Sequence, residues 1–283
     1  MTNQPLLFTG EQRTSLFSAI LVHDDCYLDA KLPEKIHFNY SQEQISKCYQ
    51  ICLELWQQGV KRKSLRRLIR KYFKFRSVKS ECKHDFKNMR AKFKHLRFAH
   101  ATFTKEHSYP WTFHIMVSLM GLLQDASKNH QRNVVKFASA SILMFLSKLC
   151  YKTMAKRLKS FSPSTPKSLQ DYTIKKMLFI QINLNRNKIT ARGFHRMRVI
   201  ISQQVALYDN LKTLYPSDYH SSISKYLSTL NGMMGSLHDE LVIKKYNKTF
   251  DYNNDYFAIP NEIRERLTNY VNKFGLTDNL VLV

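Results

Sequence analysis

Two histidines stand at the start of helical segments, each followed by a cation three residues later. His84 precedes Lys87, and His195 precedes Arg198. Residues three apart share a helix face, so each pair can present an imidazole and a cation side by side. Helix starts also leave backbone N–H groups for anions, and a nearby phosphate favours the charged form of histidine. Both positions therefore indicate anion binding.

The sequence around the first histidine is strongly basic. The chain of 283 residues has 45 Lys and Arg against 21 Asp and Glu, which gives a net charge of +24. Sixteen of these cations lie between Lys61 and Arg97, with only Glu81 and Asp85 to offset them. Like charges at this density repel one another, and a polyanionic partner relieves the repulsion. Nucleic acid, a phosphate polymer and an anionic membrane surface all have suitable charge.

Two amphipathic helices, residues 61–76 and 81–103, must position these cations. At 100° per residue, each helix separates an apolar face from a polar one. The first has apolar Leu65, Leu68, Ile69, Tyr72 and Phe75 opposite basic Lys63, Arg66, Arg67, Arg70 and Lys74. The second has apolar Phe86, Met89, Phe93 and Leu96 opposite His84, Lys87, Ala91, Lys94 and His95. Cations on such a face recur at each turn, ~5.4 Å apart, which is close to the length of a couple of phosphate units.

The remaining sequence is also predicted to be helical. Seven Gly and seven Pro are few for this length, and no alternating strand of useful length is found. Helices are expected over residues 41–76 with a division at Gly59, 81–103, 111–126, 132–160, 168–187, 193–214, 217–246 and 260–275. The expected domains are an unassigned extension at 1–40, a first helical repeat at 41–162, a second at 163–250, and a C-terminal loop and helix at 251–283. The fold class is all-α, with antiparallel neighbours.

The two halves on either side of the proline-rich linker, Ser162 to Pro166, look alike. The segment that starts at His84 pairs with the one that starts at His195. Thirty-odd residues later each half has a Leu-x-x-Leu pair, and the second continues as Met234-Gly235-Ser236-Leu237-His238-Asp239. The corresponding stretch in the first half, Gln124 to Ser127, matches loosely and is expected to lack the glycine. We therefore predict an internal repeat.

Over roughly residues 80–250 this pattern resembles the CHAD family, the conserved-histidine α-helical domains. Their hallmark is a helix that opens with His and a cation at i+3, used twice, each time with a companion helix of the form Leu-x-x-Leu…Leu-Gly-x-x-Arg-Asp. His238 stands where the family usually has Arg, and Asp239 is in place. Ser202, Gln203 and Val205 depart from the pattern, because the family tends to have Lys or Arg there.

The resemblance implies two antiparallel helical bundles, related by a pseudo-twofold repeat, around a basic groove or pore that binds inorganic polyphosphate without cleaving it. A cytoplasmic protein is expected, with polyphosphate granules as one location. No cofactor, no metal and no catalytic residue is expected. The candidate polyphosphate-binding residues are Arg66, Arg70, Lys74, His84, Lys87, Lys94, His95, His195 and Arg198.

Other functions stay open from the sequence. A nucleic-acid binder is the first alternative, since phosphate contacts dominate both cases; exposed aromatic residues beside the cations would favour it. An enzyme that cleaves phosphate anhydrides is disfavoured, because acids are scarce and neither paired carboxylates nor a glycine-rich phosphate loop is found. A helical scaffold for an acidic protein or a membrane is the third alternative.

The five scattered cysteines suggest a reducing compartment, and no apolar stretch is long enough to cross a bilayer.

Overall fold

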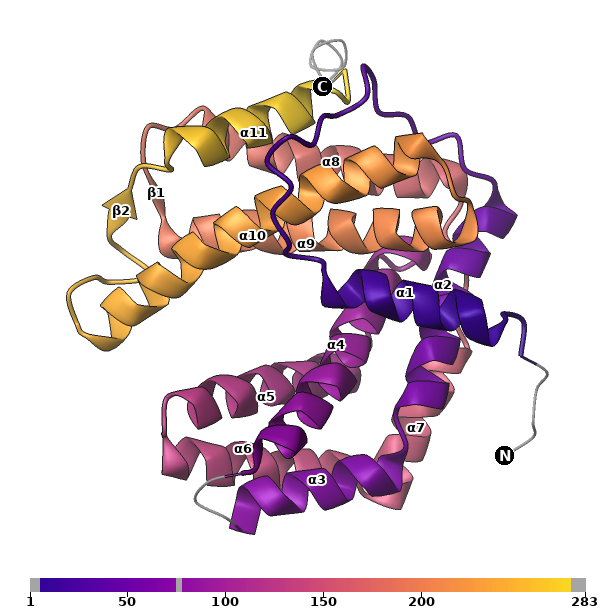
Figure 1. Cartoon of the computed structure of the whole chain (residues 1–283), viewed down its shortest axis with the longest axis vertical. Coiled ribbons are helices and arrows are strands. Elements are labelled where there is room, and N and C mark those ends of the chain that lie inside the picture. The colour runs from indigo at the N-terminus through magenta and orange to yellow at the C-terminus, as the bar shows by residue number, and fades with distance from the viewer. Residues whose placement is uncertain (1–5, 75–77, 276–283) are drawn as a thin grey trace. The chain divides into compact units, whose positions relative to one another are not determined.

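A computed structural model describes residues 6–74 and 78–275 (Figure 1). The described residues form eleven helices and one pair of two-residue strands, which confirms the all-α class. These described residues divide into two compact units: residues 6–21 with those of 42–164, and residues 22–41 with 165–275. Each unit is described separately below.

The first unit contains seven helices. They are α1 (Gly10–Leu21), α2 (Gln42–Gly59), α3 (Arg62–Lys74), α4 (Ser80–Phe103), α5 (Trp111–Lys128), α6 (Arg132–Phe145) and α7 (Lys148–Lys159). Helix α4 packs against both α2 and α5. The contact is made by fully buried rings: Trp56 lies 5.6 Å from Phe93, and Phe93 lies 5.6 Å from Phe113, centroid to centroid. This aromatic core buries one side of α4, while Lys87 on the same helix is exposed.

The second unit contains four helices. They are α8 (Pro166–Leu184), α9 (Ala191–Leu214), α10 (Asp218–Tyr246) and α11 (Asn261–Asn272), with the antiparallel strands β1 (Ile189–Thr190) and β2 (Tyr256–Phe257). Helices α9 and α10 lie side by side along most of their length (Figure 1). Thr190 and Ser217 begin them as N-caps, since each hydroxyl accepts a hydrogen bond from a backbone N–H three residues later.

Residues 22–41 are held on α10 by specific hydrogen bonds. The Tyr27 N–H donates to Thr229 Oγ1 at 2.7 Å, and Asn231 Nδ2 donates to the carbonyl oxygen of His23 at 3.0 Å. The sequence segment His23 to Cys26 is therefore part of a docked loop. Residues 6–21, in contrast, belong to the first unit, where Glu54 accepts from the Leu7 N–H and pairs with Arg13. The predicted extension is thus shared between the two units.

Substitution of Gly232 by alanine is expected to destabilise the second unit. A Cβ at this position would lie 2.3 Å from the Asp24 carbonyl oxygen, so the loop must move away from α10. Overpacking of this kind costs about 1–3 kcal/mol. Urea unfolding of the variant, compared with Gly10→Ala, measures the effect, since nothing lies within 4 Å of a Cβ at Gly10. Equal unfolding midpoints would contradict the close approach.

The structure corrects some predicted helix boundaries. The single helix expected over 132–160 is two helices, because the chain breaks at Leu146 and Ser147, and the Ser147 hydroxyl caps α7. Helix α1 was not predicted. Gly59 ends α2 as expected, and the Lys92 side chain lies against it, where a Cβ would come within 2.6 Å of Lys92 Cε. Predictions on Phe75, Arg76 and Ser77 lie outside the described residues.

Among the described residues, none of the helices taken singly has the length and apolar composition needed to cross a membrane. Helices α6 and α7 pass such a test only as a pair bent by 71°.

Candidate functional site

Four cations form a continuous stripe along α4. Lys87, Arg90, Lys94 and Arg97 follow one another at intervals of three and four residues, so they share a helix face. Lys87 is exposed, and the other three are partly exposed. The stripe covers three helical turns, roughly 15 Å. An extended phosphate chain could therefore contact several of these cations at once. We call these four residues the α4 stripe.

Arg90 leans from the α4 stripe onto α5. Its Nη2 would lie 3.2 Å from a Cβ built at Gly121, so the absence of a side chain at Gly121 gives the guanidinium room against the α5 backbone. The Nε of Arg90 is shielded from solvent. A larger residue at 121 would push the guanidinium outward. The glycine therefore sets the position of one cation in the stripe.

Arg97 and His114 extend the site toward the start of α5. The Arg97 guanidinium lies 5.8 Å from the Tyr109 ring centroid, and the same ring stacks on His114 at 4.8 Å. Arg97 Nε and His114 Nδ1 are buried and make no hydrogen bond with the described residues. Burial lowers the pKa of Arg97, nearby Tyr109 opposes this, and Arg90 adds a smaller lowering. Positive charge is thus concentrated here in partly desolvated surroundings.

Removal of the Arg97 charge is expected to raise the pKa of His114. Burial lowers the pKa of this imidazole first, and the Arg97 cation lowers it second, so Arg97→Gln removes a like charge that opposes protonation. An NMR titration of the His114 ring protons in both proteins measures the shift, with Arg157→Gln on α7 as a charge-matched control. A fall in the His114 pKa, or an equal rise in the control, would contradict the contact.

The second unit has a smaller cationic cluster between α9 and α10. Arg198 lies over Gly235, where its Nη2 would be 3.0 Å from a Cβ. His195 is exposed, and its ring lies 4.8 Å from that of His238. His238 Nε2 is within hydrogen-bond distance, 2.9 Å, of the Tyr252 hydroxyl. The pKa of His238 is lowered by burial and then by Arg198, with Asp239 opposing. The structure therefore brings His195 and Arg198 together.

The two arginine–glycine contacts occur within matching sequence patterns. Phe86-x-x-Met89-Arg90 on α4 has the spacing of Phe194-x-x-Met197-Arg198 on α9. On the partner helices, Met120-Gly121-x-Leu123-x-Asp125 has the spacing of Met234-Gly235-x-Leu237-x-Asp239. The expectation that the first companion helix lacks the glycine was wrong, because Gly121 stands four residues before Asp125. When the halves are aligned by pairing Arg90 with Arg198, Lys87, and not His84, corresponds to His195.

One of the two candidate histidines of α4 does not lie where it was expected. His95 is 5% exposed, so its placement on an exposed polar stripe was wrong; α4 is covered on more than one side in the region of His95. His84 is exposed near the start of α4, one turn before Lys87. Lys87 and Lys94 do belong to the stripe. Sequence reasoning missed Arg90 and Arg97, although their spacing from Lys87 could have identified them.

The basic face of α3 is partly used within the first unit. Arg66 and Arg62 both donate to the Leu146 carbonyl oxygen, at 3.2 Å and 2.8 Å, and so satisfy the end of α6. Arg70 and Lys74 are exposed. The apolar face is confirmed at Leu65, Leu68, Ile69 and Tyr72, which are buried. Arg66 therefore has a structural partner, whereas Arg70 and Lys74 present their charge to solvent.

The middle of α9 is a buried polar network and not a row of cations. Ser202 Oγ donates to Asn231 Oδ1 at 2.7 Å, and the Tyr172 hydroxyl donates to Gln203 Oε1 at 3.4 Å. Every residue from 201 to 211 is buried. The positions that lack Lys or Arg are thus interior positions, where an unpaired cation would be costly.

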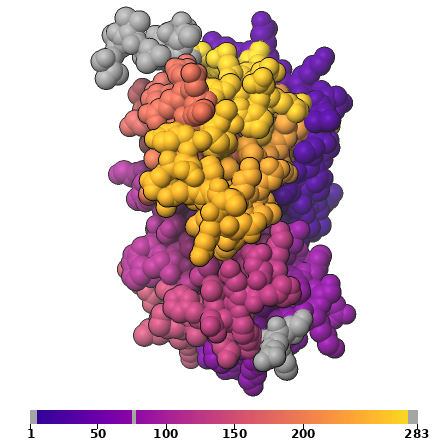
Figure 2. Space-filling view, turned by 90° about the vertical axis from the view of Figure 1, so that its left-hand side faces the viewer, coloured from indigo at the N-terminus to yellow at the C-terminus, as the bar shows by residue number. Residues whose placement is uncertain are grey.

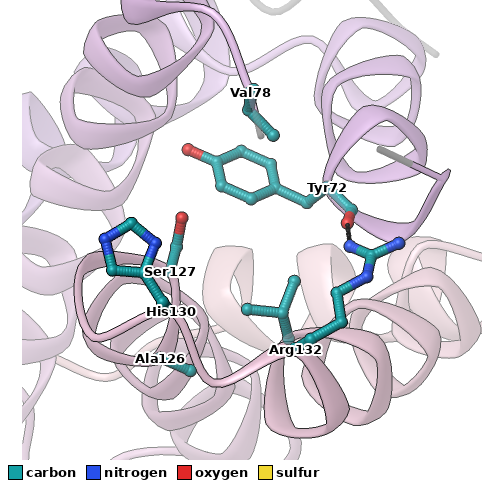
Figure 3. Close-up of a pocket in the computed structure, with 7 residues that line it drawn as sticks. Tyr72, Val78, Ala126, Ser127, His130 and Arg132 are labelled. Carbon is teal, nitrogen blue, oxygen red and sulfur yellow. Dashed lines mark hydrogen bonds between the residues drawn. The ribbon is translucent and has the colours of Figure 1, made fainter. Parts of the chain in front are cut away.

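A cavity of about 300 Å³ lies between the end of α3 and the start of α6 (Figure 3). Tyr72, Ser127, His130 and Arg132 line it. The Arg132 guanidinium donates to the carbonyl oxygens of Tyr72 at 2.9 Å and of Phe73 at 2.8 Å. A cation at a helix C-terminus stabilises the helix. The cavity therefore has a basic wall whose charge is already engaged with the backbone.

The described cysteines are free thiols, and the described residues contain no cluster suited to a metal ion. Cys48, Cys52 and Cys82 are buried thiols, Cys26 and Cys150 are exposed, and all five are free. Burial strongly raises the pKa of Cys48, so this thiol stays protonated. Within the same described ranges, no three His, Cys, Asp or Glu side chains gather in a way that could hold a metal ion.

A scan of family models, a search of curated proteins and a search of solved structures each found no match to this chain.

Proposed function

We propose that this protein binds inorganic polyphosphate through the α4 stripe, and that it does so as a CHAD-like protein with an internal repeat. The observation that carries the proposal is the alignment of Lys87, Arg90, Lys94 and Arg97 on one face, with Arg90 set by Gly121. A phosphate polymer is a flexible line of negative charge. A linear track of ammonium and guanidinium groups is complementary to it, since Lys provides point charges and Arg can hold two oxygens.

The proposed repeat rests on the two matching contacts, Arg90 with Gly121 and Arg198 with Gly235. In the second unit the cations stop after Arg198, because α9 then enters its buried network. The two proposed contact regions are therefore unequal: the α4 stripe in the first unit is the longer one, and His195 with Arg198 in the second unit is the shorter one. His84, Arg70 and Lys74 remain candidate contacts at the surface of the first unit.

Binding without cleavage is the proposed chemistry. The α4 stripe and its neighbours offer guanidinium, ammonium and imidazole groups. These groups can hold an anion, and their attraction to it is stronger where water is excluded. They do not by themselves provide a metal or an activated nucleophile for anhydride cleavage. Incubation with polyphosphate and Mg²⁺ or Mn²⁺, followed by assay of released phosphate, tests this part. Steady release above a no-protein blank would overturn it.

Polyphosphate is preferred over nucleic acid because of the aromatic residues around the stripe. Single-strand binders stack bases on exposed rings. Here Phe86, Phe93 and Phe98 are buried and the Tyr109 ring stacks on His114, whereas Trp111, at the start of α5, is 63% exposed. A competition experiment tests the preference: protein bound to immobilised long-chain polyphosphate is challenged with single-stranded DNA, duplex DNA or free polyphosphate at equal phosphate concentration and fixed salt. We expect free polyphosphate to displace most of the protein. Equal displacement by either DNA would refute the preference.

A further inference from the structure

A second cavity, in the second unit, has the composition of a ligand site and is separate from the residues discussed above. It has a volume of about 440 Å³ and lies where the end of α8, the strand pair and the start of α9 meet. Figure 2 shows the surface of this end of the second unit, with the segment around β1 (salmon) beside the orange and yellow segments that include β2 and α11. A volume of this size is in the range of sites for small organic molecules. It exceeds what a single inorganic phosphate needs.

Three arginines converge on this cavity. Arg186 follows α8, and Arg192 and Arg196 come from the first turns of α9. None of the described residues that line the cavity is acidic. The guanidinium groups of these arginines make no hydrogen bond or ion pair with the described part of the chain. Three unneutralised guanidinium groups around one cavity form a strong anion-attracting surface, and each can hold two phosphate oxygens.

Two backbone N–H groups near the cavity are already used and are not available to an anion. The Gly193 N–H already donates to the Thr190 hydroxyl at 3.2 Å, and the Arg192 N–H donates to the Tyr252 carbonyl at 3.3 Å. Recognition of an anion would therefore depend on the arginine side chains. Lys176, three residues before Phe179 on α8, adds to the positive charge near the cavity. Its pKa is lowered by burial and then by the nearby charge of Arg196.

The rest of the cavity wall combines aromatic and apolar side chains with Asn183 and Thr190. Arg196 lies 4.5 Å above the Phe179 ring centroid, which fixes the guanidinium against the wall. Tyr256 is 63% exposed and Ile182 is 56% exposed. An exposed ring beside arginines suits a ligand with a planar body as well as a phosphate. A bare phosphate polymer would leave this apolar surface unused.

We propose that this cavity binds a nucleoside phosphate, with its phosphates on Arg186, Arg192 and Arg196 and its planar base on Tyr256. This proposal does not depend on binding at the α4 stripe, because its residues lie in the second unit and differ from His195 and Arg198. It predicts that the protein distinguishes ATP from inorganic triphosphate, which has the phosphates without the base.

Calorimetric titration of the full chain with ATP, AMP and inorganic triphosphate at fixed salt tests the proposal. Arg192→Gln with Arg196→Gln should weaken ATP binding at least about tenfold, because each replacement removes a charge-assisted contact. Lys244→Gln with Lys245→Gln removes the same charge from an exposed part of α10 and should change ATP affinity less than about twofold. Tyr256→Ala should weaken ATP binding and leave triphosphate binding unchanged.

Three results would overturn the proposal: unchanged ATP affinity in the arginine variant, an equal loss in the lysine control, or equal affinity for ATP and triphosphate that Tyr256→Ala does not alter. If the double arginine variant does not fold, Arg186→Gln alone provides the same test, since Arg186 is exposed after the end of α8. Lys87→Glu with Lys94→Glu separates the two sites. Loss of ATP binding in that variant would assign the nucleotide to the α4 stripe and reject the cavity.

Discussion

Reversal of two charges in the α4 stripe, Lys87→Glu with Lys94→Glu, should weaken polyphosphate binding about 30-fold or more. Charge-assisted hydrogen bonds contribute about 1.5–3 kcal/mol each, and 2 kcal/mol corresponds to about 30-fold. Fewer phosphate contacts also release fewer counterions, so the slope of log affinity against log salt should fall by roughly 1.5 to 2. Fluorescence anisotropy with labelled polyphosphate at several salt concentrations measures both quantities.

The first unit provides a matched control for this experiment. Lys152 and Lys159 on α7 are exposed, have the same seven-residue separation and change the net charge equally when reversed. Lys94 lies 5.6 Å from the Phe98 ring centroid, so its replacement by Glu also removes a weak cation–π contact of about 0.5–1 kcal/mol. Thermal unfolding should show that the variant still folds. An equal loss of affinity in the control would mean that net charge, and not the stripe, attracts the polymer.

Replacement of Asp209 by alanine should produce the largest loss of stability in the second unit. The Asp209 side chain is 1% exposed and accepts from the Ser224 hydroxyl at 2.9 Å and from Lys212 Nζ at 2.9 Å. Its removal leaves a partly buried ammonium without its counter-charge. Breaking a buried pair costs about 3–5 kcal/mol. Since the Lys212 side chain is 24% exposed and can reach water, we expect about 2–4 kcal/mol, measured by urea unfolding.

Asp171→Ala is the corresponding surface control. Asp171 lies 3.8 Å from Lys167, and the two side chains are 50% and 84% exposed. An exposed pair of this kind contributes less than about 1 kcal/mol. Polyphosphate affinity per folded molecule should not change in either variant, because neither residue belongs to the proposed site. A similar stability for the two variants would contradict the role of the buried network in α9.

Most helices were predictable because their apolar residues recur at helical spacing. Helix α3 is the clearest case, since Leu65, Leu68, Ile69 and Tyr72 are all buried. The break between α6 and α7 was not predictable from this spacing, because apolar residues continue through Leu146 and only Ser147 marks the new N-terminus. The docking of residues 22–41 on α10 depends on contacts about 200 residues apart, such as Tyr27 with Thr229. Local patterns cannot reveal such contacts.

The candidate site was predictable only in part. Lys87 and Lys94 were found because a helical projection shows which residues share a face. The burial of His95 was missed, since a projection does not show how many neighbours cover a helix. Arg90 and Arg97 were missed although their spacing from Lys87 places them on its face, and the two halves were paired by their histidines. Pairing by the arginine–glycine contacts instead requires the packing of α4 on α5 and of α9 on α10.

The most direct measurement is lysine footprinting of the protein with and without polyphosphate. Brief acetylation followed by mass spectrometry reports the accessibility of each lysine, and Lys87, Lys94, Lys152 and Lys159 can be compared in one sample. Polyphosphate should protect Lys87 and Lys94 strongly and leave Lys152 and Lys159 reactive. Equal protection of all four lysines, or protection confined to α7, would contradict binding along the α4 stripe.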